Sequence, residues 1–267
     1  MDPKNFVYLS DQGNDEYINM LAVASGGIIT DTRDFDYGQS KQPIVLRGIL
    51  KYKLMQKCLE DSRDFYYIDT GYLQKARHGK SNKLWHRIVK NDLQHNTLIS
   101  RDGKRFQRMG ISLPKKRLFG SKIIIAAPDE KPCRAYGIEL ENWISTTVDT
   151  LKKYSDREII IRHREKNRSN RMLHNSLKSV LHDDVHALVT FNSNSATESI
   201  LCGVPAFVLS PSHAAGPVAN RDLASIETPF WPDNDLLYRW CCHLSYCQVH
   251  VRELQTPDVW SILQGKS

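Results

Sequence analysis

The stretch that most constrains the fold of this chain is residues 186–210, where a short apolar run, a polar turn, a helical pattern and a second apolar run follow one another. The first run, 186–191, is short and contains β-branched residues, which is typical of a strand buried in a parallel sheet. Residues 196–202 predict a helix of about two turns, which Gly203 ends before a second strand at 206–209. This strand–helix–strand pattern predicts an α/β fold.

The turn between the first strand and the helix, 192–195, supplies small polar side chains and a helix N-cap. The backbone N–H groups at the start of such a helix lack partners and the helix dipole is positive there, so the position suits a phosphate. Glu198 lies on the first turn of the same helix, where a carboxylate can accept hydrogen bonds from a ribose. An ordinary capped helix explains the same residues, and both interpretations remain open at this point.

The segment 193–208 resembles the donor-binding segment of GT-B glycosyltransferases, namely the peptidoglycan N-acetylglucosaminyl transferase and the capsule-polysaccharide transferases. In those enzymes a Ser/Thr-rich turn binds the diphosphate of a nucleotide-sugar, a Glu binds the ribose, and Gly-x-Pro precedes the next strand. The Gln-rich sugar contact of the peptidoglycan enzyme is absent here. The resemblance implies donor-binding roles for Ser193, Asn194, Ser195, Thr197 and Glu198 and, in the segment that follows the second strand, for His213 and Gly216.

A basic segment follows the strand predicted at 158–161. In the capsule-type transferases, an Arg/Lys-x-His or Arg-His-Pro segment at this position helps to bind the donor phosphates. Arg162, His163, Arg164 and Lys166 match that position, although the Pro is missing. A guanidinium there would neutralise a leaving diphosphate. A basic loop at the end of a strand, without a ligand, is the alternative interpretation.

In the first half of the chain, a strand predicted at 65–68 ends on Asp69-Thr70-Gly71-Tyr72. An acidic residue at the carboxyl end of a buried strand lies where open α/β sheets place their ligands. Asp69 is therefore our candidate for the catalytic base, and an Asx turn leading out of the strand is the alternative.

Two strongly basic stretches, 74–90 and 101–117, follow this strand. Basic side chains interleaved with aromatic ones suit a surface that binds phosphates and stacks on bases. A solvated loop is the alternative for the first stretch, and a linker or flap between two domains is the interpretation for the second. The candidate nucleic-acid contacts are Tyr72, Lys75, Arg77, Lys80, Lys83, Trp85, His86, Arg87, Arg105 and Arg108.

Residues 68–94 also resemble, more faintly, bacteriophage glycosyltransferases of DNA hypermodification. Those proteins carry an Ile-Asp-x-Gly-Tyr strand end, then an aromatic-His/Tyr-Arg pattern and Asn-x-x-Gln. The corresponding residues here begin at Ile68, Trp85 and Asn91. This resemblance implies double-stranded DNA as a partner and a 5-hydroxymethylpyrimidine, such as hydroxymethylcytosine, as the acceptor.

The composition, with 40% hydrophobic and 25% charged residues, is that of a folded protein. A net charge of +7 favours an anionic partner, which a nucleotide-sugar, a nucleic acid or an acidic membrane would satisfy equally. No apolar run is long enough for a membrane span and the first residues lack the apolar core of a signal peptide, so we expect a cytoplasmic protein, in the host cytoplasm if it is phage-encoded.

Metal binding is not expected from the sequence. Cys241, Cys242 and His243, with Cys247 and His250, have the residue types of a zinc site. Their segment reads as a helix with apolar neighbours, however, where Cys is usually a small apolar residue. We also predict donor binding without an obligatory metal.

Alternating strands and helices predict an α/β protein with two Rossmann-like domains facing a cleft, of GT-B type. We expect an acceptor-binding domain at 1–117 and a nucleotide-sugar-binding domain at 118–267; in GT-B folds the closing helix often crosses back to the first domain. The predicted function is transfer of a sugar from a UDP-sugar, a co-substrate rather than a tightly bound cofactor, to hydroxymethylated DNA. A polysaccharide or lipopolysaccharide acceptor, and a non-catalytic nucleic-acid-binding protein on a transferase scaffold, are the alternatives.

Overall fold

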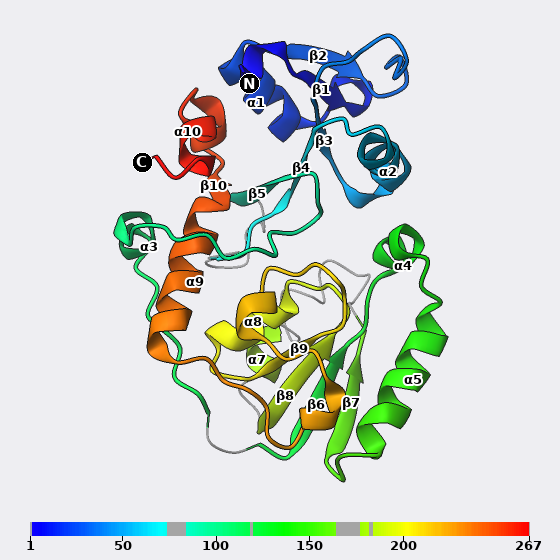
Figure 1. The fold of residues 1–267 in the computed structure, drawn as a ribbon, viewed down its shortest axis with the longest axis vertical. Helices are drawn as coiled ribbons and strands as arrows, with labels where there is room; N and C mark the ends of the chain where they lie inside the picture. The colour runs from blue at the N-terminus through cyan, green and yellow to red at the C-terminus, as the bar shows by residue number, and fades with distance from the viewer. Residues whose placement is uncertain (1, 74–83, 118–119, 164–176, 182–183, 267) are drawn as a thin grey trace. The chain divides into compact units, whose positions relative to one another are not determined.

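The structure is a computed structural model that describes residues 2–73, 84–117, 120–163, 177–181 and 184–266 (Figure 1). The chain divides into two compact units. Unit 1 comprises Met1–His95, Arg101–Met109 and Cys242–Ser267, and unit 2 comprises Asn96–Ser100 and Gly110–Cys241. This division differs from the boundary expected after residue 117, chiefly because the last 26 residues, Cys242–Ser267, belong with the first half of the chain.

Unit 1 is built on a six-stranded sheet with the order β10-β5-β4-β3-β1-β2. Strands β1 to β4 are parallel, β5 is antiparallel to β4, and β10 is antiparallel to β5. The strands are β1 Val7–Ser10, β2 Ile28–Asp31, β3 Ile44–Arg47, β4 Phe65–Thr70, β5 Trp85–Lys90 and β10 Gln248–His250. The helices are α1 Glu16–Ser25, α2 Tyr52–Glu60, α3 Lys104–Arg108 and α10 Val259–Leu263.

Local sequence signals explain the bounds of α1. The Asp15 carboxylate caps its first turn by accepting a hydrogen bond from the Ile18 N–H at 3.3 Å. Gly26 ends the helix in the left-handed conformation, with φ of 65°. The next residue must also be a glycine, for a different reason. A Cβ on Gly27 would lie 2.1 Å from the buried Tyr8 ring.

Strand β5 corrects the interpretation of residues 85–90 as a basic surface. It is an interior strand of the sheet, between β10 and β4, and His86 and Arg87 on it are buried. Its residues lack the apolar alternation that predicts a strand. The region 101–117, expected as a linker or flap, likewise contains the short helix α3, whose Arg105 is buried.

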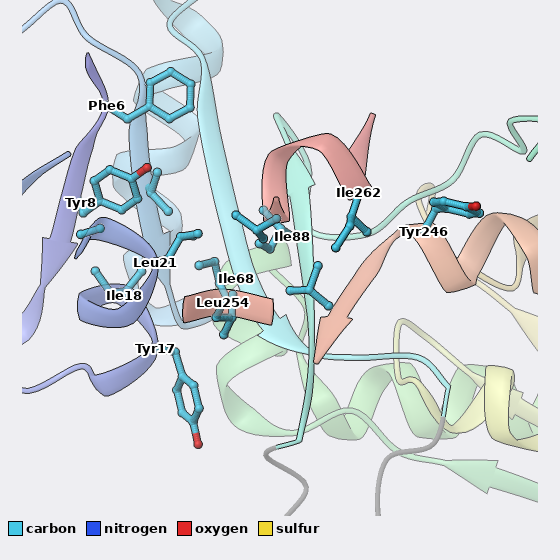
Figure 2. Close-up of a cluster of buried hydrophobic side chains, with 14 residues drawn as sticks. Phe6, Tyr8, Tyr17, Ile18, Leu21, Ile68, Ile88, Tyr246, Leu254 and Ile262 are labelled. Carbon is cyan, nitrogen blue, oxygen red and sulfur yellow. The ribbon is translucent and has the colours of Figure 1, made fainter. Parts of the chain in front are cut away.

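The C-terminal segment completes the core of unit 1. Tyr246, Leu254 and Ile262 join Ile18 and Ile68 in one cluster of buried side chains (Figure 2). Arg105 pins the same segment by a paired contact with the Glu253 carboxylate, at 2.6 and 2.7 Å, and by hydrogen bonds to two of its backbone carbonyls. Both the apolar and the polar interior of unit 1 therefore depend on the C-terminal segment.

Unit 2 is built on a four-stranded, fully parallel sheet with the order β7-β6-β8-β9. Apolar residues of β6, β8 and β9 form its core with Leu151, Leu223 and Ile226. The strands are β6 Lys122–Ala126, β7 Glu158–Arg162, β8 Val185–Thr190 and β9 Ala206–Val208. The helices are α4 Glu130–Tyr136, α5 Leu140–Lys152, α7 Leu177–Val180, α8 Ser195–Leu201 and α9 Asn234–Tyr246, whose last residues belong to unit 1.

Two features with a bearing on function are absent from the described residues. Across those ranges, no helix combines the length and the apolar character that a membrane crossing requires. No three His, Cys, Asp or Glu side chains gather into a group able to hold a metal ion, again within the described part of the chain. The cysteines considered above for zinc, Cys241, Cys242 and Cys247, are buried, as expected for apolar residues of a helix and its flank.

Candidate functional site

The predicted donor-binding residues follow three strands of unit 2 at the same edge of the sheet. Because β6 to β9 are parallel, their carboxyl ends, such as Arg162 on β7, Thr190 on β8 and Val208 on β9, meet at one edge. Open α/β sheets bind their ligands at this edge. The predicted strand–turn–helix–strand pattern at 186–209 is confirmed, with bounds shifted by one residue.

The turn after β8 is held in place from both sides. The Thr190 hydroxyl donates a 2.8 Å hydrogen bond to the Ala126 carbonyl, which ties the end of β8 to β6. The Ser193 hydroxyl accepts the N–H of Ser195 at 3.2 Å. Asn194 occupies the N-cap position of α8, although its side chain makes no capping hydrogen bond.

Two side-chain hydroxyls at the start of α8 are buried. Ser195 is 6% exposed and Thr197 is 0% exposed. Considering the described residues only, neither side-chain oxygen has a hydrogen-bond partner. A buried hydroxyl without a partner costs about 1–3 kcal/mol, so such groups are uncommon in folded proteins and suggest a bound ligand.

His213 braces the turn from the loop after β9. Its Nδ1 accepts the N–H of Ala215 at 3.0 Å, so its Nε2 carries the proton and donates to the Ser193 carbonyl at 3.0 Å. The residue is fully buried. The resemblance implied a donor-binding role for His213, and its observed contacts join the β8–α8 turn to the loop after β9.

Fewer contacts describe the other predicted donor residues. Glu198 and Arg162 are half-buried and each takes part in a further interaction, and His163 is exposed. Gly216 lies close to Arg221, whose Nη2 would be 2.9 Å from a Cβ at that position. Arg164 and Lys166 lie outside the described residues.

Asp69, the predicted base, is the penultimate residue of β4 in unit 1, at the carboxyl end of that strand. One carboxylate oxygen, Oδ2, accepts the Tyr67 hydroxyl at 2.6 Å and the Arg87 Nη2 at 3.1 Å. The other oxygen, Oδ1, accepts the N–H of Thr70 at 2.7 Å. The Asp69 side chain is 39% exposed, so solvent or a ligand can reach it.

The surroundings of Asp69 keep it ionised. Burial acts to raise the pKa of its carboxyl, but Arg87, the Tyr67 hydroxyl, the Thr70 N–H and the more distant Arg47 together hold the pKa below its ordinary value. Asp69 is therefore a carboxylate at neutral pH, which is the form that accepts a proton.

Of the six candidate nucleic-acid contacts that the structure describes, four are buried in unit 1. Tyr72, His86, Arg87 and Arg105 are each less than 9% exposed, so they have no free surface to offer a DNA backbone. Their polar groups serve the interior instead: the Tyr72 hydroxyl, for example, accepts the N–H of His95 at 3.1 Å.

Two described residues of that set are more accessible: Trp85 is half-buried and Arg108 is exposed. Lys75, Arg77, Lys80 and Lys83 lie outside the described residues. The structure therefore brings no basic surface together from the predicted set within its described part.

A surface cavity of about 350 Å³ in unit 2 contains none of the predicted site residues. Its lining includes Asn142, Trp143 and Thr146 of α5, with Leu209 just after β9. None of residues 193–198, which carry most of the predicted donor contacts, lines this cavity.

Comparisons with known proteins bear on the fold. No family model matches the chain, and no curated protein matches it significantly. Among solved structures, the beta Kdo 2,7 transferase of KpsC from Thermosulfurimonas dismutans matches 96% of this chain and 99% of its own, with a TM-score of 0.57 and 10% identity. The beta Kdo 2,4 transferase of the same KpsC matches 91% of each chain, with a TM-score of 0.53 and 12% identity. This chain therefore has a fold found in glycosyltransferases.

Proposed function

We propose that this protein is a glycosyltransferase that moves a sugar from a nucleotide-sugar to a hydroxyl of a saccharide acceptor. The fold supports the class of enzyme, because both similar structures are named as sugar transferases. Their names favour a saccharide acceptor over hydroxymethylated DNA. The buried positions of Arg87 and Arg105 weaken the case for DNA further.

The observation that carries the proposal is the pair of buried, unpartnered hydroxyls at the β8–α8 turn. Within the described residues, Ser195 Oγ and Thr197 Oγ1 have no hydrogen-bond partner. A donor phosphate that opens this turn on binding would supply acceptor oxygens for both hydroxyls, which are closed off from solvent in the free protein, and for the first N–H groups of α8. Glu198, on the same turn of helix, is assigned to the ribose of the donor. The UDP-sugar and the two-domain GT-B organisation stay predictions.

In the proposed reaction, Asp69 is the general base. The O–H bond of the acceptor breaks and its proton passes to the Asp69 carboxylate. The electron pair of that oxygen forms the new bond to the anomeric carbon of the sugar. The bond between that carbon and the donor phosphate breaks, and its electrons leave with the nucleotide. Hydroxyl and N–H donors around the phosphate stabilise the charge that develops on the leaving group.

The first test is a thermal-shift screen of the purified protein with UDP, GDP, CMP and ADP. A ligand that binds only the folded state raises the melting temperature by mass action. We expect a shift with at least one nucleotide, followed by transfer of the matching labelled sugar to an oligosaccharide. Activity that survives EDTA would bear out metal-independent transfer.

A matched pair of variants tests the donor site. Glu198→Gln should abolish the nucleotide shift and transfer, whereas Glu141→Gln, on the first turn of α5 and exposed, should leave both unchanged. Transfer to hydroxymethylated duplex DNA, with none to saccharides, would replace the acceptor in this proposal. The absence of any nucleotide shift and any transfer would overturn the proposed function.

A further inference from the structure

Arg87 and Asp69 face each other across two strands of unit 1. The register of β4 and β5 pairs Asp69 directly with Arg87. Directly paired residues project from the same face of a sheet, and so does Tyr67, two residues before Asp69. The three side chains therefore meet because of strand register, although Arg87 is 18 positions from Asp69 in the sequence.

The guanidinium of Arg87 is fixed on several sides. Its Nη1 donates to the Thr70 carbonyl at 2.9 Å while its Nη2 donates to Asp69 Oδ2. The guanidinium lies over the rings of Tyr67 and Tyr72, with its carbon 5.7 and 5.4 Å from their centroids. The Arg87 side chain is 8% exposed against 39% for Asp69, so solvent reaches the carboxylate rather than the guanidinium.

The two oxygens of the Asp69 carboxylate differ in how many hydrogen bonds they accept. Oδ2 holds two donors, the Tyr67 hydroxyl and Arg87 Nη2, whereas Oδ1 holds one, the Thr70 N–H. A carboxylate oxygen can accept about two hydrogen bonds, so Oδ1 keeps room for one more donor. Within the described residues, no further donor reaches it.

We infer that Arg87 is a positioning residue, which orients the Asp69 carboxylate so that Oδ1 receives the proton of the acceptor hydroxyl. This inference rests on the proposed function for its reaction. The clamp, by which we mean the hold of Arg87 and Tyr67 on Asp69 Oδ2, rests only on the contacts given above. A buried arginine in a strand would destabilise unit 1 if its charge were unpaired. Its pairing with Asp69 removes that cost, and the positioning role gives a reason for an arginine to be there.

The charges around Asp69 determine the sign of the expected pH effect. Arg87 and the Tyr67 hydroxyl face it from β5 and β4, and Arg47 acts from the end of β3. All three favour the ionised carboxylate, so removing one raises the pKa of Asp69. The rate then begins to fall at a higher pH, because the base is protonated sooner as the pH is lowered.

Arg87→Met tests the inference with the transfer assay. We expect kcat to fall by roughly 10- to 100-fold and the acid limb of the kcat profile to move up by about 1–3 pH units. Arg87→Lys restores a charge but not the paired geometry, so it should recover the acid limb more fully than kcat. Tyr67→Phe keeps the ring and removes one hydrogen bond to Oδ2, which gives a milder variant if Arg87→Met fails to fold.

Arg63→Met is the matched control. Arg63 is 9% exposed, donates to the Gln42 carbonyl at 2.8 Å and lies over the Tyr37 ring, so it is a buried arginine of purely structural role. This control should lower stability and leave the pH profile unchanged. A folded Arg87 or Tyr67 variant with wild-type kcat and an unmoved acid limb would overturn the inference.

The two proposals fail in different ways. If the wild-type protein transfers no sugar, the proposed function fails. A carbon-13 titration of the Asp69 carboxyl, which needs no activity, still tests the clamp. A higher Asp69 pKa in Tyr67→Phe than in the wild type would support it, and equal values would refute it.

Discussion

At the scale of single residues, the hydroxyls of unit 2 fall into two kinds. Thr190 is fully buried and its hydroxyl donates to the Ala126 carbonyl at 2.8 Å. Thr197 is also fully buried, but within the described residues its hydroxyl has no partner. The two threonines are seven positions apart and differ in what their hydroxyls do. This difference predicts opposite consequences for the same substitution.

Thr197→Val should leave the free energy of unfolding unchanged or raise it, because it removes a buried hydroxyl that gains nothing in the free protein. The same change should weaken nucleotide binding by about 10- to 100-fold, the worth of a hydrogen bond to a charged group. Urea unfolding and nucleotide titration measure the two effects. Thr190→Val is the control: it should cost about 1–2 kcal/mol of stability, because the Ala126 carbonyl loses its donor. A loss of stability in Thr197→Val with unchanged nucleotide affinity would contradict the assignment.

At the scale of elements, the sequence predicts a strand or helix well where several local patterns agree, and poorly where contacts with distant residues decide. The turn and helix after β8 were predicted closely, because apolar runs, a capping turn and Gly203 all indicate the same pattern. Strand β5 was missed, because His86 and Arg87 break the apolar alternation and are buried through contacts with distant residues. Strand β10 was missed because it continues from α9 after a single residue.

In the candidate site, too, the sequence predicted what one strand determines and missed what depends on two. The place of Asp69 at a strand end was predicted, since one strand determines it. Its clamp was not, because contact with Arg87 requires the register of two strands. Arg87 was instead assigned to DNA on the basis of charge, a signal that cannot tell a buried guanidinium from a surface one.

The glycines that end helices give a prediction at this scale. Gly203, just after α8, has φ of +83°, and a Cβ there would lie 2.2 Å from the Lys115 carbonyl oxygen. Gly137, after α4, has φ of +64° but open space around a Cβ. Gly137→Ala should cost about 1–2 kcal/mol through backbone conformation alone. Gly203→Ala adds a clash with the backbone and should cost about 2–5 kcal/mol in total. Urea unfolding measures both, and equal costs would show that the Lys115 segment moves aside freely.

At the scale of the whole molecule, the chain returns to unit 1 after completing unit 2. Cys242–Ser267 supplies β10, α10 and the core residues Tyr246, Leu254 and Ile262. It also supplies the Glu253 carboxylate that neutralises the buried Arg105. Unit 1 therefore cannot be complete until the last residues of the chain are present, whereas unit 2 is formed by one nearly continuous stretch.

Deleting 242–267 should consequently unfold unit 1 and spare unit 2. Leaving Arg105 buried without its partner costs about 3–5 kcal/mol, and the lost apolar contacts add to this, against a typical total stability of about 5–15 kcal/mol. Hydrogen exchange read strand by strand measures the outcome. We expect fast exchange in β1 to β5 and slow exchange in β6, β8 and β9, which serve as the internal control because both units are in the same molecule. Slow exchange in β1 to β4 of the shortened chain would show that the parallel strands form a stable core without the C-terminal segment, and that this segment only closes the edge of the sheet.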